Sequence, residues 1–142
     1  MLSQTIEGFR LSPQQKQLWF LQQNGDIYCA QFILKIKGKL QKGKLREALQ
    51  KLVDRHEALR TVFYRQPGIK IPIQVIKEEG AFSWRELNQS DWGAHQLEGL
   101  FQEERQFMSN FDFNSEHNPL LHALLLAESS EQWLLLITLP SL

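Results

Sequence analysis

Arg55-His56-Glu57-Ala58-Leu59-Arg60-Thr61-Val62-Phe63 joins the end of a helical pattern directly to the start of a strand pattern. The helical pattern is an apolar stripe formed by Leu45, Ala48, Leu49, Leu52 and Val53. Five residues of the quoted stretch are polar or charged, namely Arg55, His56, Glu57, Arg60 and Thr61. An ordinary helix end needs no such concentration of polar groups, so we expect this stretch to position something specific.

A first helix is predicted over residues 13 to 23. Ser12, Pro13 and Gln15 have the chemistry of the N-cap, N1 and N3 positions, because the hydroxyl and the side-chain amide satisfy backbone amides at a helix start. Asn24-Gly25 then supplies a stop. A strand follows from Tyr28, where alternation predicts one buried face made of Tyr28, Ala30, Phe32, Leu34 and Ile36.

The rest of the chain alternates strands with helices. A turn bracketed by Gly38 and Gly43 leads to a helix over 42 to 58, and strands over 61 to 65 and 69 to 76 flank Pro67-Gly68. Pro72 predicts an edge or a bulge in the second of these strands.

A polar segment over 78 to 89, anchored by Phe82 and Trp84, precedes a third helix capped by Ser90-Asp91. The apolar positions of that helix are Trp92, Leu97, Leu100, Phe101, Phe107 and Met108. Two nearly continuous apolar runs, over 120 to 127 and 133 to 139, predict a hairpin of buried strands at the centre of the sheet. Helices packed on a mixed sheet are therefore the expected α+β architecture.

Composition narrows the classes of function. The 142 residues include 42% hydrophobic residues, which is enough for one domain that buries about 70% of its unfolded surface. The 16 basic and 16 acidic residues cancel, which disfavours nucleic acid and membrane surfaces as partners. No apolar run approaches the ~20 residues of a spanning helix and no signal peptide is recognisable, so we expect a cytoplasmic protein.

The stretches 11–21 and 55–63 resemble the first two core motifs of the condensation domains of nonribosomal peptide synthetases. The resemblance continues through Phe111-Asp112-Phe113, Pro119-Leu120-Leu121 and the run 133–139, and so covers essentially the whole chain. Those domains make peptide bonds between carrier-bound aminoacyl groups. The resemblance implies a two-layer mixed β-sheet with helices packed on it, as one lobe of a chloramphenicol acetyltransferase-like fold.

In that family two lobes enclose a tunnel, which the phosphopantetheine arms of carrier proteins enter from both ends. The resemblance therefore implies that residues 1–142 form an incomplete domain, the N-terminal lobe without its second lobe, either as a fragment of a longer synthetase or as a piece of a split protein. Such a piece is not expected to catalyse condensation alone. The resemblance implies that the partners are carrier proteins, the C-terminal lobe or neighbouring synthetase domains. It also implies possible self-association through the exposed lobe interface. No directly bound cofactor is expected.

The family's His-His, three variable residues and Asp-Gly follow the second strand of the hairpin. By that count the two histidines correspond to Pro140 and Ser141. Imidazole suits proton transfer near neutral pH, whereas a serine hydroxyl needs another base beside it. We interpret the site as degenerate; the alternative is a shifted register, with a histidine pair beginning after Leu142.

The resemblance further implies that Arg55 and Arg60 brace the site loop, although they are also placed to cap the helix C-terminus. His56 and Glu57 are interpreted as hydrogen-bond partners that shape the fold rather than as catalysts. His122 stands where the family carries arginine.

Other polar residues receive structural interpretations. His95 and His117 have no metal-ligand spacing, and Cys29 is interpreted as an inert strand residue without a cationic neighbour. Lys35, Lys37, Lys39, Lys42 and Lys44 form a basic run, interpreted as a solvated edge or as a surface for an acidic carrier protein. Trp19 and Phe20 are assigned to the core.

Two functions remain open. The chain is either part of a peptide-forming enzyme, active only with its second lobe and a supplied base, or a non-catalytic module that docks a carrier protein or a neighbouring domain. A coenzyme A-dependent acyltransferase of the same fold is a third possibility, which would also require the missing histidine.

Overall fold

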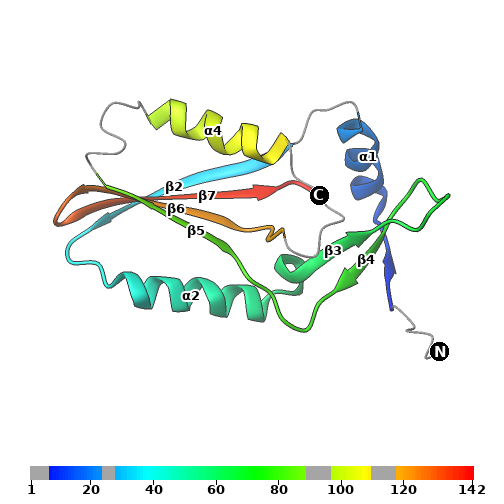
Figure 1. The fold of residues 1–142 in the computed structure, drawn as a ribbon, viewed down its shortest axis with the longest axis horizontal. Coiled ribbons are helices and arrows are strands. Elements are labelled where there is room, and N and C mark those ends of the chain that lie inside the picture. The colour runs from blue at the N-terminus through cyan, green and yellow to red at the C-terminus, as the bar shows by residue number, and fades with distance from the viewer. Residues whose placement is uncertain (1–6, 24–27, 89–96, 110–117) are drawn as a thin grey trace.

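Two β-sheets and three α-helices make up the part of the chain that the computed structural model describes, residues 7–23, 28–88, 97–109 and 118–142 (Figure 1). The larger sheet contains β2 (Cys29–Lys37), β5 (Ser83–Leu87), β6 (His122–Ser129) and β7 (Gln132–Pro140), in the order β2-β7-β6-β5. β5 runs parallel to β6, and the other pairs are antiparallel. The β6–β7 hairpin is central and largely buried, as predicted.

Helices α2 (Lys42–Arg55) and α4 (Leu97–Ser109) lie on opposite faces of this sheet (Figure 1). Because side chains alternate along a strand, β6 and β7 contribute to two separate apolar clusters. The cluster on the α2 face contains Leu49, Leu121, Ala123, Leu125, Leu135 and Ile137. The cluster on the α4 face contains Leu100, Leu124, Leu126, Leu134 and Leu136.

The predicted burial of one face of β2 was wrong. Ile36 packs on the cluster beside α2, but Phe32 and Leu34, on the same face, are 46% and 50% exposed. Tyr28 is 45% exposed, and Ala30 is also exposed. Alternation identifies which residues share a face, but it does not show whether anything covers that face.

The smaller sheet contains β1 (Phe9–Arg10), β4 (Ile73–Ile76) and β3 (Thr61–Tyr64), in that order and antiparallel. Helix α1 (Pro13–Gln22) lies next to it (Figure 1). A third apolar cluster joins this end of the molecule to the end of α4 and consists of Leu11, Trp19, Phe63, Met108 and Leu120. Trp19 is buried as predicted, but the core assignment of Phe20 was wrong, because that residue is 49% exposed.

The predicted start of α1 is confirmed by a reciprocal capping box. The backbone N–H of Gln15 donates to Ser12 Oγ at 3.1 Å, and the backbone N–H of Ser12 donates to Gln15 Oε1 at 2.9 Å. These bonds satisfy two amides that have no partner within the helix.

The helix predicted over 42 to 58 ends earlier, at Arg55. His56 has extended backbone angles, φ −107° and ψ 107°, and a 3₁₀ turn, η1 (Glu57–Arg60), follows it. The quoted motif thus spans a helix end, a tight turn and the first three residues of β3, rather than one continuous helix end. The strand predicted over 69 to 76 begins only at Ile73, so Pro72 lies just before it. β4 pairs regularly on both sides, between β1 and β3, so the predicted edge or bulge was wrong.

Two strands were not predicted. β1 has only two residues, and β5 contains Trp84, Arg85 and Glu86, so its sequence has too many polar residues to resemble a strand. The predicted cap Ser90-Asp91, the helix residue Trp92, the Phe111-Asp112-Phe113 motif, His95 and His117 lie outside the described residues.

Candidate functional site

Pro140 is the last residue of β7 and Ser141 follows it; the sequence predicted these two residues at the family's histidine positions. Pro140 pairs in register with Cys29, so their side chains share the sheet face on which α4 lies. The backbone N–H of Ser141 donates to the carbonyl of Tyr28 at 2.9 Å, which continues the β2–β7 pairing beyond the strand. Ser141 is exposed and Pro140 is half-buried. A hydroxyl therefore stands at the sheet end, on a backbone held by β2.

A partly buried polar network holds this end of β7 to α4. Gln31 Nε2 donates to Thr138 Oγ1 at 3.3 Å and to the carbonyl of Phe101 at 3.1 Å. Arg105 Nε donates to Gln31 Oε1 at 2.8 Å. Thr138 is only 1% exposed, so the bond from Gln31 satisfies a hydroxyl that water does not reach, whereas Gln31 is half-buried and Arg105 is exposed. The network fixes the strand two residues before Pro140.

Cys29 lies beside this network. Burial raises the pKa of its thiol, and the positive charge of Arg105 lowers it by less. The sequence-based statement that Cys29 lacks a cationic neighbour was therefore wrong. The balance nevertheless keeps the sulfur in its neutral, weakly nucleophilic form.

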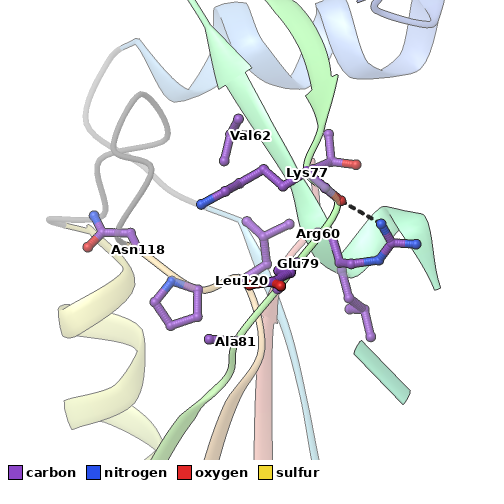
Figure 2. Close-up of a pocket in the computed structure, with 11 residues that line it drawn as sticks. Arg60, Val62, Lys77, Glu79, Ala81, Asn118 and Leu120 are labelled. Atoms are coloured by element: carbon purple, nitrogen blue, oxygen red, sulfur yellow. Dashed lines mark hydrogen bonds between the residues drawn. The ribbon is translucent and has the colours of Figure 1, made fainter. Parts of the chain in front are cut away.

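Arg60 uses its guanidinium to hold the backbone. Arg60 Nε donates to the carbonyl of Val53 at 3.2 Å, and Nη1 donates to the carbonyl of Lys77. Figure 2 shows the second of these bonds, directed away from the side on which Asn118 lies. The described contacts of Arg60 therefore tie the end of α2 to the residue after β4. Arg55, in the last turn of α2, has an exposed side chain.

His56 and Glu57 contribute to the turn through their backbones. The N–H of His56 donates to the carbonyl of Leu52 at 3.0 Å, and its carbonyl accepts from Leu59 at 3.0 Å. The carbonyl of Glu57 accepts from Thr61 Oγ1 at 2.8 Å. Both side chains are exposed, so the expected fold-shaping bonds are made by the main chain.

A cavity of about 330 Å³ lies between two of the stretches that carry the family resemblance, 55–63 and 119–121 (Figure 2). One wall is formed by residues 59–62 of the quoted stretch, and another by Pro119 and Leu120. Lys77, Glu79 and Asn118 add polar groups to the lining. Gly80 closes it at a point where space is tight, because a Cβ there would lie 2.7 Å from Val53 Cγ1 and 2.6 Å from Arg60 Cγ.

A second cavity, of about 200 Å³, contains ionisable groups that the sequence did not indicate. It is lined by Ser83, Arg85, Glu103, Glu104, Phe107, His122 and Ala123. Glu104 is 8% exposed and lies 3.7 Å from Arg85 Nη1; burial raises its pKa, Arg85 lowers it, and Glu103 raises it. His122 is 6% exposed, and burial lowers its pKa more than a hydrogen bond with the backbone of Pro119 raises it. The sequence did not indicate this cluster because its members come together only where α4 packs on the sheet.

The basic run extends from the end of β2 to the start of α2. Lys42 Nζ lies 3.0 Å from Glu86 Oε2 and 5.2 Å from the ring centre of Trp133, and Lys35 Nζ lies 4.0 Å from Glu128 Oε2. Side chains of Lys35 and Lys42 are 53% and 44% exposed, so these pairs contribute little to stability.

Within the described residues, no three His, Cys, Asp or Glu side chains gather closely enough to hold a metal ion. No helix in the same part of the chain combines the length and apolarity needed to cross a membrane.

A family model described as "Condensation domain" matches residues 6–139. This chain belongs to the condensation domain family. Among curated relatives, bacitracin synthase 2 of Bacillus licheniformis is 35% identical over 136 residues, covering 92% of this chain and 5% of the synthase. Malpinin synthetase of Mortierella alpina is 32% identical over 137 residues, covering 90% of this chain and 2% of that synthetase.

Two solved structures have the same fold. The starter condensation domain of rhizomide synthetase, as an R148A mutant, has a TM-score of 0.75 at 19% identity, covering 96% of this chain and 33% of the solved chain. The X-domain from teicoplanin biosynthesis has a TM-score of 0.68 at 21% identity, covering 97% and 29%. The chain thus spans about a third of these solved chains and a twentieth or less of the two synthetase relatives.

Proposed function

We propose that this chain is the N-terminal lobe of a nonribosomal peptide synthetase condensation domain. Its substrates would be aminoacyl or peptidyl thioesters on the phosphopantetheine arms of carrier proteins. The observation that supports the proposal most strongly is the condensation family match over residues 6–139, which ends one residue before Pro140, the first of the two expected site positions.

We further propose that the site is catalytically degenerate. The positions that correspond to the histidine pair hold Pro140, which has no side-chain donor or base, and Ser141, whose hydroxyl requires a partner base. The neighbouring side chains support this interpretation, because the Cys29 thiol is held neutral and Gln31 and Thr138 bind each other. The attacking amine would therefore lack a group suited to take its proton.

The two arginines support different roles. Arg60 has its guanidinium committed to two carbonyls, which favours the helix-end role for this residue. Arg55 has an exposed side chain at the helix end, which leaves it accessible to a site loop. We propose that Arg55 braces the site loop directly. Arg60 would act on that loop only indirectly, by fixing the position of the turn after α2.

Restoring the histidine tests this function. A fusion in which this chain replaces its matching segment in bacitracin synthase 2 is supplied with loaded donor and acceptor carrier proteins, and amide product is measured by intact-protein mass spectrometry. Ser141→His should raise the rate roughly 100-fold over the unmodified fusion, whereas Ser141→Ala should not raise it. If Ser141→His gives no increase in a folded fusion, the missing imidazole does not account for inactivity.

A second candidate function is a non-catalytic docking module. The X-domain from teicoplanin biosynthesis, which has the same fold at a TM-score of 0.71, was solved in a complex with OxyB. Pro140 and Ser141 suit such a role, since docking needs no base. In that case the unmodified fusion should bind a carrier protein or a neighbouring domain and Ser141→His should leave product formation at background.

A further inference from the structure

The face of the large sheet beside α2 is only partly covered. Strands lie about 4.8 Å apart and a helix with its side chains is about 10 Å wide, so a four-stranded sheet needs roughly two helices on each face. On this face α2 is the helix present among the described residues. The apolar floor next to it is exposed and consists of Tyr28, just before β2, and of Ala30, Phe32 and Leu34 in β2.

The flanks of α2 show on which side the uncovered space lies. Arg46 Cζ is 5.4 Å from the ring centre of Trp84 on β5, and Gln50 Nε2 donates to the carbonyl of Gly80 just before β5 at 2.8 Å. At about 100° per residue, Ala48 and Leu52 lie about 160° around the helix from Gln50. They therefore belong to the opposite flank, which faces β7 and β2. Leu52 is 43% exposed and Ala48 is also exposed.

These residues outline one apolar trough. Its floor is the exposed face of β2, beside the buried Leu135 and Ile137 of β7, which pair with Leu34 and Phe32. Its wall is the flank of α2 with Ala48 and Leu52. From Tyr28 to Leu34 the floor is about 20 Å long, the length of a helix of about 13 residues.

The rim of the trough is basic. Lys44, Lys51 and Arg55 lie within about 60° of Ala48 on the solvent side of α2, and all three are exposed. Between the described residues there is no ion pair that involves any of these three cations. An occupant with acidic residues along this flank would gain favourable charge pairs as well as apolar burial.

We propose that the trough receives an amphipathic helix, acidic along the flank that faces α2, from the part of a condensation domain that this chain does not span. The inference rests on the proposed function. It is supported by the solved condensation domains, of which this chain spans about a third, so about two thirds of such a chain is available to supply the helix. The shape of the space favours a helix over a strand, because the occupant would lie beside α2 in the same layer.

Peptides test the inference without requiring a second protein to fold. Fluorescent 20-residue peptides that tile the condensation domain of bacitracin synthase 2 beyond its match to this chain are titrated with the 142-residue protein, and anisotropy is measured. We expect a peptide with an apolar stripe and an acidic flank to bind. Phe32→Glu should weaken that binding at least tenfold, because Phe32 is at the centre of the floor.

Two matched control variants distinguish binding in the trough from nonspecific binding. Ile69, which is 48% exposed and lies outside the trough, gives the control Ile69→Glu, which should leave binding unchanged. Lys51→Glu should weaken binding about threefold, an effect that salt reduces, whereas Lys39→Glu, away from this flank, should not.

Two results would overturn the inference. One is that no tiled peptide shows binding that depends on Phe32. The other is a stable dimer that Phe32→Glu dissociates and that no peptide displaces, since the face would then belong to a second copy of this chain. Neither result bears on histidine restoration: a fusion that gains activity with Ser141→His keeps the proposed function even if the trough inference fails.

Discussion

Arg60 donates hydrogen bonds to the carbonyls of Val53 and Lys77 and thereby ties the end of α2 to the chain after β4. Loss of hydrogen bonds from a charged donor costs about 1.5–3 kcal/mol. We predict that Arg60→Ala lowers the free energy of unfolding by about 2 kcal/mol in urea titrations. Arg55→Ala, at an exposed position in the same motif, should change it by less than about 0.5 kcal/mol. Equal effects would contradict the structural role assigned to Arg60.

Glycine is needed at position 80 because the surrounding atoms leave no room for a Cβ, rather than because of its backbone angles. A Cβ at this position would lie under 3 Å from Val53, which is fully buried, and from Arg60. Gly80→Ala should therefore destabilise the fold by about 1–3 kcal/mol. Gly99→Ala is the matched control: it lies in α4 with open space around it, so alanine should stabilise by about 0.5–1 kcal/mol. Thermal unfolding of both variants checks the opposite signs.

At the scale of elements, the capping box of α1 gives a separate prediction. Ser12→Ala removes the hydroxyl that accepts from the backbone N–H of Gln15 and should cost about 1 kcal/mol of unfolding free energy. Gln14→Ala, at an exposed position one residue before Gln15, should be nearly neutral. A loss below about 0.3 kcal/mol for Ser12→Ala would indicate that the cap does not hold α1.

The packing of α4 on the sheet should make stability depend on pH. Burial holds the pKa of His122 below 6.5 in the folded state, so the unfolded chain binds the proton more readily. The associated stability is present above pH 6.5 and is lost as the pH falls below 6.5 toward the folded-state pKa. Glu104 has the opposite sign: because burial raises its pKa above 4.5, its contribution falls as the pH rises through the range above 4.5.

We predict that, between pH 7 and pH 5, His122→Gln loses less stability than the wild-type protein, because the variant lacks the buried imidazole whose pKa is lowered. Urea midpoints at half-unit pH steps measure both. An identical slope in wild type and His122→Gln would show that His122 does not cause the dependence.

The elements differ in how far the sequence predicted them. The cap at Ser12 and the β6–β7 hairpin were predictable, because both depend on local chemistry or on an uninterrupted apolar run. β5 was missed because its stability comes from parallel pairing with β6, a distant segment that periodicity does not reveal. The exposure of Phe32 and Leu34 was missed for a related reason, since burial depends on a neighbouring element as well as on the strand.

The candidate site was predictable only in part. The motif around Arg55 and Arg60 and the positions Pro140 and Ser141 came from the resemblance, and the structure adds their surroundings. The network of Gln31, Thr138 and Arg105 was not predictable, because its members come from β2, β7 and α4 and share no sequence pattern. The same applies to Glu104 and His122.

At the scale of the whole molecule, the chain carries the fold of about a third of a condensation domain, with an apolar trough beside α2 and a polar but base-poor strand end at Pro140 and Ser141. These two features make separable predictions. The trough concerns how the remaining part of a domain is joined, and the strand end concerns whether the joined domain can transfer an acyl group.

The most direct measurement is single-turnover condensation by the unmodified fusion with bacitracin synthase 2, with carrier-protein binding recorded on the same sample. We predict that the loaded carrier proteins bind but that amide product stays at the level of a no-enzyme control, because Pro140 and Ser141 supply no base. Product formation within about tenfold of the relative's own domain would contradict the degenerate site, since a domain without an imidazole there should lose at least roughly 100-fold.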